Sequence, residues 1–204
     1  MNPWPRLYPI LDASSFLDSE ALFSAAEELM AGGATLLQYR NKSGNAREML
    51  EQALELKRRI GGSAKLIMND RADLCLAAGC DGVHVGQDDL SPAGARKVIG
   101  ERFWLGVSTH NSEQVKAADK TSANYLAIGP VFSTFSKANP DAVIGLEGVR
   151  NARALTQKPL VAIGGINRAN CRAVIEAGAD SVAVISDLMR EPRKSARDFF
   201  RILG

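Results

Sequence analysis

The chain alternates short apolar runs with longer amphipathic segments, and this alternation recurs eight times along its 204 residues. Runs that are apolar throughout are typical of strands buried on both faces, as in a parallel sheet. Eight such pairs of strand and helix predict an α/β fold, a (β/α)8 TIM barrel. An open, doubly wound sheet is the alternative, and the count of eight favours closure. The apolar runs cover residues 7–11, 35–40, 65–69, 82–86, 103–107, 125–129, 160–164 and 181–185.

The segments between these runs carry helix signals. Ser91 followed by Pro92 offers an N-cap and a first helical residue, and Gly178 closes the helical segment before it. No linker rich in Pro, Ser or Gly interrupts the pattern, so we expect residues 1–204 to form a single TIM-barrel domain.

Charge and composition restrict the partners. The net charge is only +2 and no long basic block occurs, so we expect no nucleic-acid partner. No apolar stretch is long enough to span a bilayer and the N-terminus lacks a signal-peptide pattern, so we expect no membrane partner and a cytoplasmic location. Cys75, Cys80 and Cys171 are odd in number and lack C-x-x-C spacing, which argues against a disulfide framework and a zinc site. The sequence leaves the oligomeric state open, a homo-oligomer included.

Polar side chains follow the predicted strands at the barrel end where enzymes of this fold carry their sites. In "LLQYRNK" (36–42), Gln38, Arg40 and Lys42 occupy alternate positions and therefore share one face of an extended segment. The next strands are followed by Asn69 and Asp70, by Gln87, Asp88 and Asp89, and by Ser108 and His110.

Two of these carboxylates, Asp70 and Asp89, follow neighbouring strands and would face each other across the barrel mouth. Such a pair suits a hard, oxygen-seeking cation, Mg²⁺, shared with substrate phosphates. The alternatives are that Asp70 caps the following helix and that Asp89 merely sits in a turn. Asp88 could replace Asp89, and spacing alone does not separate them.

The two cations beside them, Arg40 and Lys42, suit an anionic group. Arginine can grip a diphosphate bidentately, while lysine supplies a mobile point charge. The alternative is an ordinary salt bridge with Asp70 at the rim. Gln38 would suit a neutral heterocycle or a sugar.

A second anion site is predicted where "IGGIN" (163–167) and "VIS" (184–186) follow the seventh and eighth strands. Gly164 and Gly165 would let backbone N–H groups approach a phosphate, with a helix N-terminus adding a partial positive charge. The alternative is an ordinary glycine turn.

The long loop after the sixth strand, 129–145, contributes Thr134, Ser136 and Lys137, and its length favours a lid or binding loop over a plain surface loop. His84 lies among valines and is expected to be a packed residue rather than a base, whereas His110 is open to either role. The sequence contains no Ser/His/Asp arrangement, metal-binding His cluster or dinucleotide fingerprint.

Two anion sites at one mouth indicate a transferase that joins two phosphorylated small molecules. The motifs and their order resemble the thiamine-phosphate synthase family over nearly the whole chain. The matching segments are "QYRNK" (38–42), "ND" (69–70), "GVHVGQDDL" (82–90), "GVSTH" (106–110), "GPVFSTFSK" (129–137), "AIGGI" (162–166) and "VAVIS" (182–186).

The resemblance implies a barrel enzyme that couples the diphosphate of a hydroxymethylpyrimidine to a thiazole phosphate, or to its carboxylated form. The products are thiamine phosphate and pyrophosphate. It also implies that Mg²⁺ is held by Asp70 and Asp89, which decides against Asp88. Arg40, Lys42 and Lys137 would stabilise the departing pyrophosphate, so no protein base is required.

The same resemblance implies which residues bind the substrates. The pyrimidine diphosphate would be bound by Gln38, Arg40, Lys42, Asn69 and Lys137, with Ser108 on the diphosphate or the pyrimidine. The thiazole phosphate would be held by Thr134, Ser136, Gly165, Ile185 and Ser186, and the matching segments add Tyr39, Asn41 and Phe135.

Two positions depart from the family pattern. Ser136 stands where the family often has Thr, which keeps the hydroxyl. Asn41 stands where an acidic residue is common, and we expect it to point away from ligand. The alternatives in function are a thiazole tautomerase of the same barrel family, which needs no diphosphate clamp, and a non-catalytic sensor of thiazole phosphate.

Overall fold

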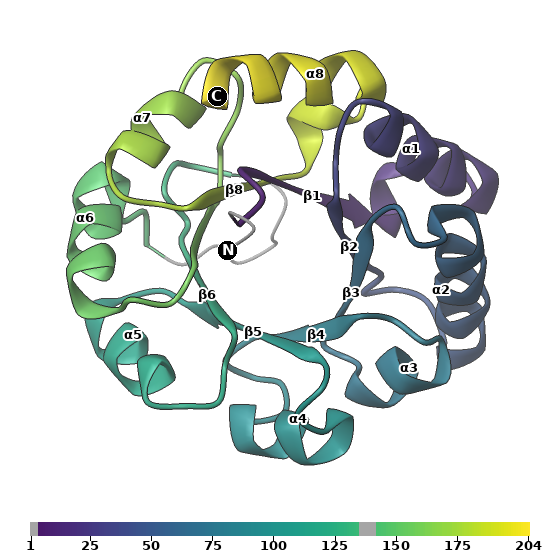
Figure 1. The fold of residues 1–204 in the computed structure, drawn as a ribbon, viewed down its shortest axis with the longest axis horizontal. Helices are drawn as coiled ribbons and strands as arrows, with labels where there is room; N and C mark the ends of the chain where they lie inside the picture. The colour runs from purple at the N-terminus through teal and green to yellow at the C-terminus, as the bar shows by residue number, and fades with distance from the viewer. Residues whose placement is uncertain (1–3, 135–141) are drawn as a thin grey trace.

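The computed structural model describes residues 4–134 and 142–204, and a closed barrel of eight parallel strands forms its centre (Figure 1). Each strand pairs with the next along the chain, and β8 returns to β1, where Leu7 pairs with Val182. The predicted (β/α)8 barrel is confirmed, and the open sheet is excluded. The strands are β1 (Leu7–Asp12), β2 (Leu36–Arg40), β3 (Lys65–Asn69), β4 (Gly82–Val85), β5 (Trp104–Thr109), β6 (Tyr125–Ile128), β7 (Leu160–Ile163) and β8 (Ser181–Val184).

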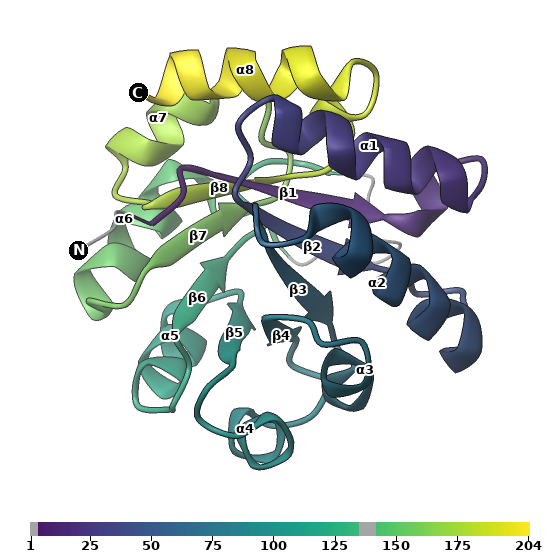
Figure 2. The same ribbon diagram turned by 45° about the vertical axis from the view of Figure 1, so that its right-hand side comes forward.

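Helices surround the barrel as an outer ring, and Figure 2 shows them flanking the strands from a second direction. Within the described residues, no helix is long and apolar enough to cross a membrane. The helices are α1 (Ser19–Ala31), α2 (Ala46–Ile60), α3 (Ala72–Ala77), α4 (Pro92–Ile99), α5 (Ser112–Asp119), α6 (Gly145–Leu155), α7 (Cys171–Glu176) and α8 (Pro192–Leu203), with 3₁₀ turns η1 (Ala13–Ser15) and η2 (Ser186–Leu188).

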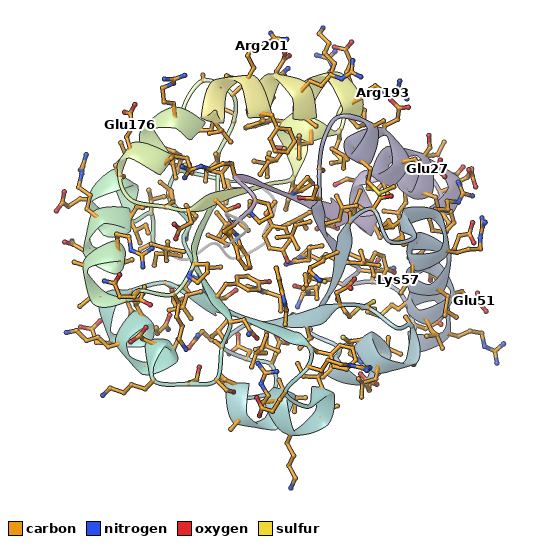
Figure 3. The ribbon with its side chains drawn as sticks, viewed as in Figure 1. Glu27, Glu51, Lys57, Glu176, Arg193 and Arg201 are labelled. Carbon is orange, nitrogen blue, oxygen red and sulfur yellow. The ribbon has the colours of Figure 1, made fainter. Side chains whose placement is uncertain are left out.

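The helix signals in the sequence act as predicted. The Ser91 side chain accepts a hydrogen bond from Gly94 N (3.1 Å), and Pro92 occupies the first turn of α4. In α2, the buried Met49, Ala53 and Leu56 recur at helical spacing and face the barrel. Charged side chains on the outer helix faces, such as Glu51 and Arg201, point away from the barrel (Figure 3).

The core has two layers because side chains alternate along each strand. Leu7 and Leu11 of β1 pack outward against the helices, whereas Tyr8 and Ile10 point into the barrel. At the amino end of the strands Trp4 stacks on Trp104, with ring centroids 4.8 Å apart, and also lies against Tyr125. These aromatic rings fill the barrel at that end.

Above the aromatic rings, a chain of hydrogen-bonded side chains crosses the barrel interior. Gln38 Nε2 donates to Tyr8 OH (3.0 Å), and Tyr8 OH lies 2.9 Å from Tyr125 OH. His84 continues the chain, with Nδ1 2.9 Å from Tyr125 OH and Nε2 2.8 Å from Ser108 Oγ. We call these five residues the polar floor. It joins five strands, and each bond is strengthened by exclusion of water.

The polar floor requires a glycine at position 106. A Cβ built there would lie 2.1 Å from Tyr125 Cζ and 2.4 Å from His84 Nδ1. We expect Gly106→Ala to lower the free energy of unfolding by about 2 kcal/mol or more, because the floor must shift to admit the methyl group. Urea unfolding followed by circular dichroism measures the change.

Gly62→Ala is the matched control. An added Cβ there meets no atom within 4 Å, and Gly62 does not adopt positive φ. Its free energy of unfolding should stay within about 1 kcal/mol of the wild-type value. Equal stability of the two variants would contradict the packing of Tyr125 and His84 over Gly106.

Candidate active site

A cavity of about 440 Å³ lies at the carboxyl ends of the strands. It brings together most of the residues predicted from the sequence. Those that line it are Gln38, Arg40, Lys42, Asn69, Asp70, Asp89, Ser108, Thr134, Gly165, Ile185 and Ser186. His84, Asp88 and His110 line it as well. Phe135, Ser136 and Lys137 lie outside the described residues.

Two predicted residues lie elsewhere, because alternation in β2 turns them to the outer face. Tyr39 is fully buried among the residues under the helices, and its hydroxyl donates to Gln52 Oε1 of α2. Asn41 Nδ2 donates to the same oxygen (3.2 Å), while its Oδ1 accepts from Gly44 N (2.7 Å). Asn41 therefore holds a turn, as expected for a residue that points away from ligand. Neither Tyr39 nor Asn41 is among the residues that line the cavity.

Arg40 has a partner that the sequence analysis missed. Asp12, the last residue of β1, is 3% exposed and forms an ion pair with the Arg40 guanidinium. Its other oxygen, Oδ1, accepts hydrogen bonds from Ser14 N (3.1 Å) and Ser14 Oγ (2.7 Å). The rule that strand ends carry the site would have found Asp12, had it been applied to the first strand.

Lys42 forms an ion pair with Asp70, so the rim salt bridge weighed from the sequence is present for Lys42 but not for Arg40. Asp70 does not cap α3: the N-cap residue is Arg71, and its side chain makes no capping bond. Asp70 instead has a φ of 61°, the only non-glycine residue with positive φ in 4–134 and 142–204. Such backbone strain costs on the order of 1 kcal/mol and is concentrated at functional sites.

Asp89 lies close enough to Asp70 to act on its carboxyl group. Burial raises the pKa of the Asp70 carboxyl, the neighbouring Asp89 raises that pKa further, and Lys42 opposes both effects. Asp89 also stabilises the turn after β4, since its Oδ2 accepts a hydrogen bond from Gly86 N (2.8 Å). Asp88 lines the same cavity, so geometry alone does not decide between Asp88 and Asp89.

This pair of carboxylates fits a divalent cation. A bound cation would favour the ionised form of Asp70, whose pKa is raised first by burial and then by Asp89. The described residues contain no group of three or more His, Cys, Asp or Glu side chains placed to hold a metal. The remaining ligands would therefore come from water or from substrate phosphate oxygens, the pattern usual for Mg²⁺.

The polar floor beneath this rim is uncharged. Burial lowers the pKa of His84 to about 4, so the imidazole is neutral at pH 7. Burial likewise raises the pKa of Tyr8 and of Tyr125. The prediction that His84 packs in the interior is confirmed, and its two nitrogens bond to Tyr125 and Ser108. The floor thus offers Gln38 and Ser108 as neutral polar groups that line the cavity.

On the opposite side, the loops after β7 and β8 line the cavity where the sequence predicts a phosphate site. We call Gly164, Gly165, Ile185 and Ser186 the phosphate cup after that prediction. Gly164 and Gly165 have φ values of 101° and 63°, which favour glycine. A Cβ on Gly165 would lie 2.5 Å from Ser133 O, so glycine also lets the β6 loop pack closely. The element that begins in the cup is η2, at Ser186, whereas α7 begins only at Cys171.

Comparisons with known proteins point to one family. A family model described as thiamine monophosphate synthase matches residues 7–188. The thiamine-phosphate synthase of Koribacter versatilis (strain Ellin345) is 60% identical over 202 residues, which cover 98% of this chain and 96% of that protein. The thiamine-phosphate synthase of Chloroflexus aurantiacus (strain ATCC 29366 / DSM 635 / J-10-fl) is 48% identical over 186 residues, which cover 89% and 83%.

A solved structure is also similar to this chain. The thiamine phosphate pyrophosphorylase of Pyrococcus furiosus superposes with a TM-score of 0.86 at 34% identity, covering 97% of this chain and 95% of that one.

The buried, neutral His84 predicts a pH dependence of stability. In the unfolded chain its pKa is near 6.5, so folding releases a proton at any pH between about 4 and 6.5. The stabilisation is complete above pH 6.5 and is lost as pH falls toward 4. The loss is about 3 kcal/mol for a shift of this size.

Replacing His84 with Gln removes this titration while keeping a polar side chain. The destabilisation caused by His84→Gln, measured by urea unfolding at a series of pH values, should shrink steadily from pH 7 to pH 4. Parallel stability curves for the two proteins would contradict a neutral, buried His84.

Proposed function

The chain belongs to the thiamine monophosphate synthase family, and on this premise we propose that it couples the diphosphate of a hydroxymethylpyrimidine to a thiazole phosphate. It is an enzyme of the transferase class that releases pyrophosphate. The observation that carries the choice of substrates is one cavity with two unlike anion-binding sides. Charged side chains of β2, β3 and the β4 loop form one side, and the glycine cup forms the other.

The charged side is proposed to bind the pyrimidine diphosphate. Arg40, fixed by Asp12, and Lys42 would contact the diphosphate and stabilise the negative charge that grows on it as it leaves. Lys137 is proposed to join them. These cations act mainly on the departing group, so their effect is larger in the transition state than in the ground state.

Asp70 and Asp89 are proposed to hold Mg²⁺, because both carboxylates line the cavity and Asp89 acts directly on Asp70. When bound, the ion would neutralise charge on the diphosphate oxygens. Lys42 is paired with Asp70 in this structure and would exchange that partner for the diphosphate.

The polar floor is proposed to receive the pyrimidine ring. Gln38 and Ser108, held at the two ends of the floor, and Asn69 beside them can hydrogen-bond a neutral heterocycle without adding charge.

The cup is proposed to hold the thiazole phosphate through backbone N–H groups of Gly165 and Ser186, with Ile185, Thr134, Phe135 and Ser136 completing the site. Anchoring by the phosphate would place the thiazole nitrogen near the methylene, where it attacks as pyrophosphate leaves. The attacking nitrogen carries no proton, so no protein base is needed. The neutral, hydrogen-bonded state of His84 accords with this scheme.

Two alternatives remain distinguishable. A thiazole tautomerase would have no use for Arg40, Lys42, Asp70 and Asp89, which all line the cavity, and this weighs in favour of coupling. A non-catalytic sensor would bind thiazole phosphate without turnover that depends on Mg²⁺.

Purified protein mixed with both substrates and Mg²⁺ should form thiamine phosphate and pyrophosphate in equal amounts, and the activity should disappear with EDTA and return with added Mg²⁺. Chromatography and a coupled pyrophosphate assay measure the two products. Binding of thiazole phosphate without either product would favour the sensor, and isomerisation of the thiazole alone would favour the tautomerase.

We expect Asp70 and Asp89 to act as one unit. Asp70→Asn and Asp89→Asn should each raise the metal requirement and lower the rate steeply, because each removes a charge that binds the cation. The double variant should be scarcely worse than the poorer single one. Direct Mn²⁺ binding, followed by electron paramagnetic resonance, should weaken in each single variant and scarcely further in the double variant.

Two neighbouring carboxylates serve as controls. Asp73 of α3 forms an ion pair with Arg71, the N-cap residue of that helix, and Asp73→Asn should leave metal binding unchanged. Asp88→Asn should also retain it, which tests the choice of Asp89 over Asp88. Losses at Asp70 and Asp89 that multiply independently would contradict a shared ion.

A further inference from the structure

The two loops of the phosphate cup are joined by an ion pair outside the cavity. Asp187, the second residue of η2, accepts three hydrogen bonds from Arg168 in the loop after β7. Its Oδ2 accepts from Arg168 N (2.9 Å) and Nε (3.1 Å), and its Oδ1 accepts from the second terminal nitrogen (3.0 Å). One carboxylate thus binds both the backbone and the side chain of the facing loop.

The loop after β7 is also braced within itself. Asn170 Nδ2 donates to Gly165 O (3.0 Å), and Asn170 Oδ1 accepts from Asn167 N (2.8 Å). This bracing makes residues 165–170 one compact turn. The position of Gly165 relative to Ser186 then depends on what joins this turn to η2, and the Arg168 pair with Asp187 is a direct connection.

Arg168 and Asp187 are not among the residues that line the cavity, whereas Gly165 and Ser186 are. We propose that Asp187, through Arg168, is a positioning residue that sets the spacing between the two halves of the phosphate cup. This inference rests on the proposed function, because it assigns the cup to the phosphate of the thiazole substrate. A phosphate that bridges two loops is sensitive to displacements of about 1 Å between its donors.

Whether removal of Asp187 weakens or strengthens phosphate binding distinguishes a positioning role from a purely electrostatic one. Asp187 follows Ser186 directly in the chain, so its negative charge alone would disfavour an anion in the cup. Removing that charge would strengthen phosphate binding if charge were decisive. Removing the connection between the loops would weaken it.

The chain offers a matched control at the opposite end of the same two strands. Asp180, just before β8, accepts hydrogen bonds from Arg153 (2.8 Å) and from Leu160 N at the start of β7 (2.8 Å). This pair also joins an aspartate to an arginine and to a backbone N–H group. It lies at the amino ends of the strands, away from the cup.

The test compares Asp187→Ala, Asp187→Asn and Asp180→Ala with the wild type. Binding of thiazole phosphate is measured by calorimetry, and binding of inorganic phosphate by NMR at the Gly165 amide. Asp187→Ala should weaken both by about tenfold or more, and raise the KM for thiazole phosphate but not that for the pyrimidine diphosphate. Asp187→Asn, which keeps one acceptor for Arg168 N, should show a smaller loss. Asp180→Ala should lower Tm about as much as Asp187→Ala does, yet change the affinity for either ligand by less than about twofold.

Unchanged or tighter binding in Asp187→Ala, or an equal loss in Asp180→Ala, would overturn the positioning role. If Asp187→Ala does not fold, Asp187→Asn makes the same comparison. A wild type that binds inorganic phosphate in the cup but no thiazole phosphate would refute the proposed substrate alone, and the variants would still decide on Asp187. A wild type that binds neither ligand would refute both.

Discussion

Closure of the sheet by pairing of β8 with β1 is the constraint on which the site depends. Because all eight strands are parallel, closure gathers their carboxyl ends around one mouth, and residues distant in sequence become neighbours. Asp12 meets Arg40 because β1 and β2 pair in register, residue against residue. The same closure lets the polar floor connect five strands, so the side chains that face the mouth rest on a surface with little freedom to shift.

The two sides of the mouth offer different physical means of binding an anion. On one side, cations are present but already paired, Arg40 with Asp12 and Lys42 with Asp70. An anion that binds there must compete with these carboxylates, so the mouth is not an unpaired cationic patch. On the other side, the four residues of the cup include no cation, so an anion there would depend on backbone N–H groups, whose spacing matters more than charge. A negative residue such as Asp187 is compatible with a cup that depends on backbone N–H groups. The same residue would oppose binding on a side that depends on cationic side chains.

The sequence predicted the elements that depend on local pattern. The predicted strands agree with the observed ones because an apolar run indicates a strand buried on both faces. Gln38, Arg40 and Lys42 line the cavity as predicted, because side chains alternate between the two faces of any strand. Contacts between distant segments were missed. Neither the pairing of Asp12 with Arg40 nor the link from Tyr8 to Tyr125 leaves a local signal, since the partners are set by barrel register. The resemblance to a family supplied roles for residues, but it did not indicate that Tyr39 faces the helices.

If the polar floor receives the pyrimidine ring, as proposed above, its neutrality suits a ring that becomes positively charged during the reaction. Every member of the floor is neutral near pH 7, and burial keeps His84 from taking up a proton. A charged imidazolium there would repel positive charge developing in the ring directly above it, whereas a neutral chain of hydrogen bonds tolerates that charge. Charge is thereby confined to the rim, where the proposed diphosphate would leave, and is kept from the floor, where the ring would rest. The same burial that stabilises the barrel interior therefore also sets the electrostatic division of the site.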